Sequence, residues 1–343
     1  MQTTVARHNS QEDKTDLLSS CFVFFICVCL SSLSTAEASP QKRHPAKKPA
    51  AKHAVAKKPA APTLDEQALQ TQVILDRANY SPGEIDGRMG TSTKRALEAF
   101  AKNGGTPDAS VAPLVTYKIT EEDAAGPFTP SIPEDMMEKA KLPALGYRNV
   151  AEALGEKFHA SPALLKALNP QIRLAAGDEI KVPNVADAVQ PVAPPRGGRQ
   201  ADPNNPATVT VTVRKGTSDL VVSDGAGHTL FYAPVTTGSE HDPLPIGEWK
   251  VNGVQKNPTF GYNPDLFWDA EPTHVKAKIP PGPNNPVGVV WIDISRPHYG
   301  LHGTPEPSTI GKTESHGCVR LTNWDALKLA ALVRPGTKVV FAE

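Results

Sequence analysis

The pattern of apolar and polar residues predicts a β-rich part at the C-terminal end of the chain. Val209, Val211 and Val213 alternate with threonines, which is the two-residue period of a strand with one buried face. Segments 288–294 (GVVWIDI) and 337–341 (TKVVF) are rich in β-branched residues and predict two further strands.

One helical pattern lies between these last two strands. Trp324, Leu327 and Ala331 have helical spacing and predict an amphipathic helix over 323–333. Several strands with a single helix predict that residues 207–343 form a mostly-β sandwich or a partly closed barrel.

Residues 63–105 have apolar residues at helical spacings instead. Leu69 and Val73 belong to a first helix, and Ala96 and Phe100 belong to a second. Pro-Gly and Asp-Gly pairs between them favour turns. A small helical domain is therefore expected in this region.

Residues 115–185 mix the two patterns. Val150 and the apolar residues after it predict one helix, and Ser161-Pro162 opens another as cap and first-turn proline. EIKVP (179–183) predicts a strand, and TYKIT (116–120) is a candidate partner for it. These elements predict a small α+β domain with a long insertion that ends near Tyr147.

The N-terminal segments change this picture, because they indicate export. An apolar run is followed by Ala36-Glu37-Ala38, so residues 1–38 are predicted to be a signal peptide. An uncleaved membrane tether is the alternative, and the start codon stays open because acidic residues precede the run. Residues 39–62 form a Lys/Pro/Ala-rich basic linker, and residues 186–206 form a Pro/Gly-rich linker. We expect the remaining chain to lie in the periplasm or the cell wall.

Charge and cysteine content narrow the function. The chain has 36 basic and 36 acidic residues, which argues against a nucleic-acid partner. Three of the four cysteines lie in the predicted signal peptide. Only Cys318 would remain after cleavage, so no intramolecular disulfide is expected.

The candidate chemistry lies in one segment, YGLHGTPEPSTIGKTESHGCVRLTNWD. A nucleophilic thiol such as Cys318 needs a base and backbone donors for the developing oxyanion. Two histidines are candidate bases: His302 at the end of a strand, and His316 next to Gly317-Cys318. Adjacent side chains usually point apart, so His316 should point away from the thiol. We therefore predict His302 as the base and the N–H groups of Gly317 and Cys318 as the oxyanion donors.

The same residues resemble a known family. His302-Gly303, a short spacer and SHGCVR (315–320) resemble the signature of the L,D-transpeptidase catalytic domain of the YkuD type. PLPIGEW (243–249) and PPGPNNPVG (280–288) are also similar to that family, so the resemblance covers 207–343.

The resemblance implies a reaction on peptidoglycan. Cys318 would attack the carbonyl between the diamino acid and the terminal D-Ala of a tetrapeptide stem. His302 would move the proton, with its ring oriented by the carbonyl of Gly303, and a thioester would form. An amine of a second stem would then give a 3→3 cross-link. Carbapenem-type β-lactams are expected to inhibit such an enzyme, and neither a cofactor nor a metal is implied.

Four residues are expected to bind substrate: Tyr299, Ser315, Arg320 and Asn323. Arg320 could position a substrate carboxylate as a planar cation. Its structural alternative is an ion pair with an acid such as Asp325.

The two N-terminal regions also resemble wall-binding modules. Residues 63–105 resemble a small three-helix peptidoglycan-binding domain, although Asn79 replaces a usual glycine and Ala101 a usual glutamine. Residues 115–185 resemble a LysM domain, although the sequence after TYKIT departs from that family. Glycan binding and a role as spacers stay open for both.

Other classes of function are still compatible with the sequence. His298, His302, His316 and Cys318 are all possible zinc ligands. A non-catalytic peptidoglycan-binding protein would not need its thiol. An L,D-carboxypeptidase or hydrolase would use the same thioester with water as acceptor. The acceptor (a stem, a D-amino acid or a wall-anchored protein) and the oligomeric state are not given by the sequence.

Overall fold

The structure, a computed structural model, describes residues 64–185 and 209–343. The predicted signal peptide and both predicted linkers lie outside the described residues. Within 64–185 and 209–343, no helix is both long and apolar enough to cross a membrane.

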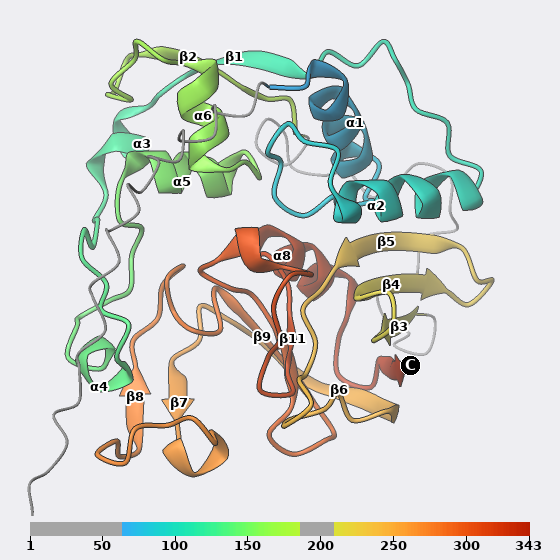
Figure 1. Ribbon diagram of the computed structural model, residues 1–343, viewed down its shortest axis with the longest axis vertical. Helices are drawn as coiled ribbons and strands as arrows, with labels where there is room; N and C mark the ends of the chain where they lie inside the picture. Colours follow the sequence, from blue (N-terminus) through green and yellow to red (C-terminus); the bar gives the residue numbers. More distant parts are fainter. Residues whose placement is uncertain (1–63, 186–208) are drawn as a thin grey trace, which may run out of the picture. The chain divides into compact units, whose positions relative to one another are not determined.

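The C-terminal part is built on one curled, mixed, eight-stranded sheet, so the partly closed barrel is the form that occurs (Figure 1). Its strand order is β11-β10-β9-β6-β12-β3-β4-β5, with β10–β11 and β12–β3 parallel. The strands are β3 (Val209–Arg214), β4 (Asp219–Asp224), β5 (Thr229–Pro234), β6 (Gly247–Lys256), β9 (Val290–Ile294), β10 (Gly300–His302), β11 (Val319–Arg320) and β12 (Lys338–Ala342).

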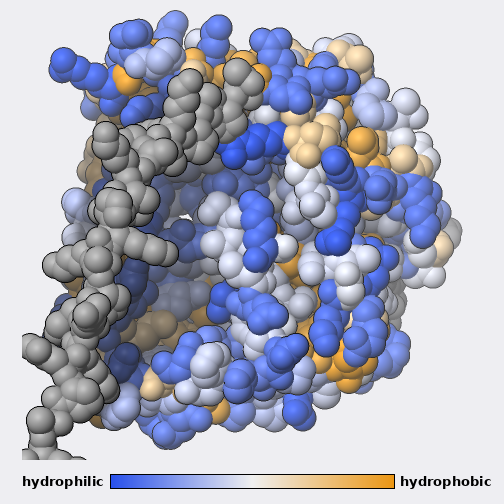
Figure 2. All heavy atoms as spheres, viewed as in Figure 1, coloured by the Kyte–Doolittle hydropathy of each residue, from blue (hydrophilic) through white to orange (hydrophobic). Residues whose placement is uncertain are grey.

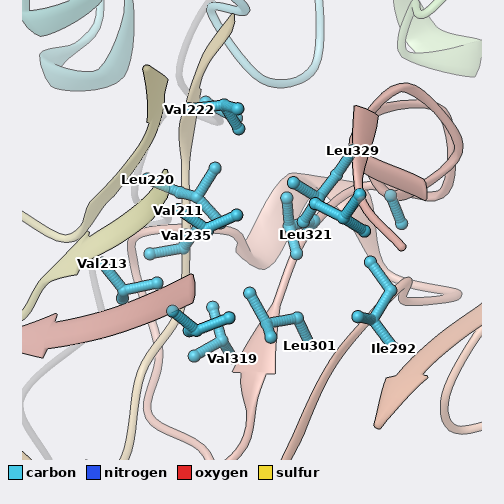
Figure 3. Close-up of a cluster of buried hydrophobic side chains, with 14 of the residues drawn as sticks. Val211, Val213, Leu220, Val222, Val235, Ile292, Leu301, Val319, Leu321 and Leu329 are labelled. Carbon is cyan, nitrogen blue, oxygen red and sulfur yellow. The ribbon is translucent and has the colours of Figure 1, made fainter. Parts of the chain in front are cut away.

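The predicted alternation produces the core of this sheet. Val209, Val211 and Val213 are all buried, while the threonines between them are half-buried. Figure 3 shows core side chains from several strands gathered with Leu329 of α8 (Asn323–Leu332). Thr322 caps this predicted helix by accepting a hydrogen bond from the N–H of Asp325.

A separate two-stranded hairpin projects from the same part. It consists of β7 (Phe260–Tyr262), the short 3-10 helix η2 (Pro264–Leu266) and β8 (Ala277–Ile279), and β7 pairs with β8 in antiparallel fashion. We call residues 260–279 the flap. A second short 3-10 helix, η3 (Pro307–Thr309), lies in the loop between β10 and β11.

The first N-terminal region is helical, as predicted, but its described residues contain two helices and not three. These are α1 (Glu66–Arg77) and α2 (Thr91–Lys102). Asn79 between them has a φ of 64°, a conformation that glycine adopts most easily and asparagine tolerates. This explains why asparagine can stand at a position where glycine is usual.

The second region contains the predicted strands and helices. The strand β1 (Leu114–Lys118) pairs with β2 (Glu179–Pro183) in antiparallel fashion. The helices α5 (Val150–Lys157) and α6 (Pro162–Leu168) lie between them in sequence, and Ser161 caps α6. The insertion holds two short helices, α3 (Glu121–Ala125) and α4 (Met136–Lys139). Membership of the LysM family stays a prediction.

The two N-terminal regions share one hydrophobic core, although the sequence suggests two separate domains. Leu69, Val73 and Ile85 from the first region are in the same buried cluster as Phe158 and Ile180 from the second. Each region has too few apolar residues for a large core of its own, and sharing one buries more apolar surface.

Buried polar groups join this N-terminal part to the sheet domain. The Asp76 carboxylate lies 2.9 Å from His159 Nδ1 and 3.3 Å from Lys328 Nζ. The hydroxyl of Ser81 donates to Asp325 Oδ2 at 2.8 Å.

The face shown in Figure 2 is mainly hydrophilic, with hydrophobic residues in scattered groups.

Candidate active site

Two short parallel strands, β10 and β11, position the predicted catalytic residues, because His302 ends β10 and Cys318 directly precedes β11. Their register pairs Leu301 with Val319 and His302 with Arg320. Leu301 and Val319 are buried in the core. Since side chains alternate along a strand, His302 and Arg320 face the other side. Cys318, which directly precedes β11, lines the same groove as these two residues.

These side chains line one groove with a volume of about 1070 Å³. The structure therefore brings Cys318 and both candidate bases, His302 and His316, to a single site. Tyr299 and Arg320 also line this groove, whereas the predicted substrate-binding residues Ser315 and Asn323 do not.

His302 is held in one orientation. Its Nδ1 lies 2.6 Å from the carbonyl oxygen of Gly303, so Nδ1 carries the proton and Nε2 has a free lone pair. The ring stacks on Trp291 at 5.5 Å between centroids. A side chain at position 303 would overlap the amide oxygen of Asn323, so this close approach requires glycine.

The charge state of His302 is set by its surroundings. His302 as a whole residue is 4% exposed, and burial, together with the cation of Arg320, lowers the pKa of His302 to about 3. The imidazole is therefore neutral at pH 7, which is the state that a general base requires.

The thiol of Cys318 is also neutral at pH 7. Burial raises the pKa of Cys318 to about 11, and the nearby Arg320 cation opposes this rise only in part. The Sγ atom lies 3.8 Å from the carbonyl oxygen of His298. The resting site thus combines a protonated thiol with a neutral imidazole.

The turn before β11 is shaped by Ser315 and Gly317. Gly317 has a φ of 96°, and a Cβ there would overlap the ring of Tyr299. The Ser315 hydroxyl donates to the Cys318 carbonyl at 2.6 Å, and its side chain is buried. The Ser315 hydroxyl therefore closes the turn, and substrate binding by Ser315 stays a prediction.

His316 is engaged by the flap. Its Nε2 lies 2.8 Å from Asp269 Oδ1, and the ring of Phe267 contacts its ring edge-on at 5.0 Å. One nitrogen of His316 is thus occupied by a carboxylate, whereas no carboxylate approaches either nitrogen of His302 among the described residues.

Arg320 has no carboxylate within ion-pair distance in the described part of the chain. Its Nη1 makes one long contact, 3.4 Å from the carbonyl oxygen of Glu314. The alternative pairing with Asp325 does not occur, since Asp325 is buried against Ser81. The guanidinium therefore faces the groove without a partner of opposite charge.

Asn323 supports the loops around the site instead of binding in the groove. Its amide Nδ2 donates to Glu156 Oε1 and to the Pro283 carbonyl, and its Oδ1 accepts from the N–H of Val289. The side chain is buried and does not line the groove, and its contact with substrate stays a prediction.

Sequence reasoning did not find Trp291 or Asp269. The sequence pattern could have indicated Trp291, because it alternates with the core residues of β9 and so lies on the opposite face of that strand. In the structure Trp291 pairs with His302 in the sheet register. No such pattern indicated Asp269, since nothing in the flap sequence shows that it reaches His316.

The zinc alternative finds no support in the geometry. Within residues 64–185 and 209–343, no three histidine, cysteine, aspartate or glutamate side chains come together as a metal site. The fold and the groove thus define a β-sheet protein in which a thiol and an oriented imidazole line one groove.

Comparison with known proteins identifies the family. Residues 208–341 match the family model YkuD, described as the L,D-transpeptidase catalytic domain. The chain is 27% identical to YkuD of Bacillus subtilis over 189 residues, which cover 54% of this chain and 90% of that protein. It is 30% identical to YqjB of Bacillus subtilis over 145 residues, which cover 40% of this chain and 73% of that protein. Both are named as L,D-transpeptidases, and the chain belongs to the L,D-transpeptidase family.

Solved structures give a weaker likeness. An L,D-transpeptidase from Mycobacterium smegmatis is 18% identical, with a TM-score of 0.33, over 40% of this chain and 59% of that one. L,D-transpeptidase 3 from Mycobacterium tuberculosis, in complex with a faropenem-derived adduct, has the same identity and TM-score over 40% of this chain and 60% of that one. The chain thus spans about three fifths of these structures.

Proposed function

We propose that this chain is an exported L,D-transpeptidase that cross-links peptidoglycan tetrapeptide stems through a thioester on Cys318. The observation that carries this proposal is the placement of Cys318, directly before β11, and His302, at the end of β10, in one groove, with His302 Nδ1 fixed by the Gly303 carbonyl. Membership of the L,D-transpeptidase family supports the reaction class.

In the first half-reaction, His302 Nε2 takes the thiol proton as Cys318 Sγ attacks the carbonyl of the diamino acid. The N–H groups of Gly317 and Cys318 stabilise the oxyanion of the tetrahedral intermediate. When this intermediate collapses, its C–N bond breaks and the imidazolium gives its proton to the leaving D-Ala amine. The product is a thioester with a neutral imidazole beside it.

In the second half-reaction, an amine of another stem attacks the thioester carbonyl. His302 accepts the proton of this amine and returns it to the departing thiolate, so the C–S bond is replaced by a new amide bond. The free thiol and neutral imidazole are regenerated.

Arg320 binds a carboxylate of the stem peptide in this proposal. A partly buried guanidinium without a carboxylate partner attracts a planar anion. The stem peptide carries free carboxylates near the scissile bond, and we assign one of them to Arg320.

Hydrolysis of the thioester, which would make the protein an L,D-carboxypeptidase, is the second candidate. A D-amino acid or a wall-anchored protein could replace the second stem as acceptor. A carbapenem-type β-lactam should acylate Cys318 by the same attack. We also propose that the protein is exported to the periplasm or the cell wall, either after cleavage of a signal peptide or as a membrane-tethered form.

The test is mass spectrometry of muropeptides after incubation with the full chain. We expect cross-linked dimers one D-Ala lighter than two tetrapeptide monomers, and no products with Cys318→Ala. Tripeptide monomers alone would instead establish the hydrolase. No change in any muropeptide, with a folded protein, would exclude both activities.

A further inference from the structure

The insertion of the second N-terminal region packs on the flap of the sheet domain and not only on its own region. Residues 126–147 contain the helix α4 and most of the insertion. Their apolar side chains join a buried cluster with those of the flap. The members from the insertion are Ile132, Met136, Met137, Ala140, Leu142 and Leu145, and those from the flap are Phe260, Tyr262, Phe267, Ala277 and Ile279.

A chain of polar contacts crosses the same interface. Asp135 Oδ2 lies 2.8 Å from His274 Nε2, and His274 Nδ1 lies 2.8 Å from the hydroxyl of Tyr262. His274 is largely buried, with 9% of its side chain exposed. The carboxylate of Asp135 thus fixes a flap histidine, which in turn fixes the strand β7.

Backbone contacts tie the insertion to the loop that follows the flap. The N–H of Leu145 donates to the Pro281 carbonyl at 2.9 Å, and its carbonyl accepts from the N–H of Asn284 at 3.0 Å. A Cβ at Gly282 would overlap the Leu145 carbonyl. Gly282 belongs to the stretch PPGPNNPVG, so this glycine allows the insertion to approach closely.

The flap in turn touches the turn that carries the nucleophile. The ring of Tyr262 packs against Phe267 at 5.4 Å, and Phe267 contacts His316 at 5.0 Å. The flap residue Asp269 holds His316 at 2.8 Å. A continuous series of contacts therefore runs from Asp135 to the turn before Cys318.

The insertion also reaches the groove directly. Glu134, Asp135 and Met136 line the same groove as Cys318 and His302. The stem peptide would lie between the flap and the strands β10 and β11, so the position of the flap affects how the peptide binds.

We propose that residues 126–147 form a wall of the catalytic groove, and that Asp135 is a positioning residue that fixes the flap for stem binding. This inference rests on the proposed function for its substrate. It makes the N-terminal part a component of the active site, beyond any role in attachment to the wall.

The test compares three variants of the full chain: Asp135→Ala, Asp135→Asn and Glu138→Ala. Asp135 also caps α4 by accepting from the N–H of Glu138, and asparagine is as good a cap. Glu138 is the matched control, because it lies on the same helix and its side chain is exposed and paired only with Lys141 in the described structure.

We expect Asp135→Ala to raise KM for a soluble tetrapeptide stem about tenfold, the size typical of losing one hydrogen bond to a charged group, with little change in kcat. Alkylation of Cys318 by iodoacetamide should not change, because a small reagent does not need the wall. Asp135→Asn should recover part of the loss, and Glu138→Ala should behave as wild type. Amide hydrogen exchange within residues 260–279 should accelerate only in the Asp135 variants.

Two results would overturn the proposal. One is flap exchange in Asp135→Ala equal to that of Glu138→Ala. The other is an unchanged KM, or a KM that changes only together with the alkylation rate, which would indicate general destabilisation. If wild-type protein shows no turnover of stems, the proposed function fails, while the exchange measurement still decides whether Asp135 fixes the flap.

Discussion

The pH dependence of thiol reactivity should separate a neutral thiol–imidazole pair from a preformed thiolate–imidazolium pair. Burial raises the pKa of Cys318 to about 11 and lowers that of His302 to about 3. The thiolate fraction falls tenfold for each pH unit below the pKa, so roughly one thiol in 10⁴ is ionised at pH 7. A cysteine with the ordinary pKa of 9.0 has about a hundredfold more thiolate at this pH.

The assay is alkylation of the full chain with iodoacetamide between pH 5 and pH 10, followed by digestion and mass spectrometry of the peptide that contains Cys318, because Cys21, Cys27 and Cys29 can react as well. We expect the rate of adduct formation on Cys318 to rise about tenfold per pH unit without a plateau. At pH 7 the rate should be about a hundredfold below that of a small exposed thiol peptide. The rate should change little in His302→Ala, because the imidazole does not hold the resting proton.

Turnover should behave differently from alkylation. Since the low pKa keeps His302 neutral, kcat/KM should stay flat from neutral pH down and fall only as the pH approaches 3. An alkylation plateau that begins below pH 7 and disappears in His302→Ala would refute this reasoning. It would show that the free enzyme already holds a thiolate–imidazolium pair.

Three further predictions follow from the site and its supports. His302→Ala should slow acylation by a factor of about 10²–10⁴, the usual contribution of a positioned acid–base group. His316→Ala should slow acylation by a smaller factor. Pre-steady-state acylation rates from mass spectrometry measure both effects. Gly303→Ala should lower kcat at least tenfold with the protein still folded, because a Cβ displaces the carbonyl that orients His302; circular dichroism and steady-state kinetics check this. Burial raises the pKa of Glu156 from 4.5 to about 8, so its ionisation opposes folding as the pH rises from about 4.5 to 8. Glu156→Gln should therefore raise the melting temperature at pH 8 and leave it nearly unchanged at pH 4.5, by thermal denaturation.

The sequence predicted the sheet domain well, because its signals are local. In each of these elements the local residue pattern indicates which positions are buried. Examples are the alternating valines of β3, the β-branched residues of β9 and β12, and the capped helix α8. The helices α5 and α6 were found for the same reason, with Ser161 as a visible cap. The pairing of strands that are distant in sequence has no local pattern. The sequence therefore left two architectures open, a sandwich and a partly closed barrel.

The candidate site was predictable to the extent that it lies in one short motif. Cys318, His302 and Gly303 stand within seventeen residues and lie together in the structure. Substrate binding by Ser315 and Asn323 stays a prediction, since the side chains of these two polar residues form hydrogen bonds within the turn and the surrounding loops. Sequence shows that a residue is polar, but the direction of its side chain depends on the fold.

Long-range packing was the part that no sequence pattern revealed. Residues 126–147 look like an insertion in a small domain, yet their apolar positions are satisfied by the flap more than a hundred residues later. The shared core of the two N-terminal regions is a second case. In both, a segment with too few apolar partners nearby is completed by another part of the chain.

The geometry of the catalytic pair depends on the core behind it. The strands β10 and β11 contain only three and two residues, so few backbone hydrogen bonds hold them. Leu301 and Val319 anchor both strands from the opposite face, where they are buried. A shift of one residue would exchange the two faces and place His302 in the core. Leu301 and Val319 therefore fix the register, and the alternation that stabilises the sheet is the same one that presents His302 and Arg320 to the groove beside Cys318.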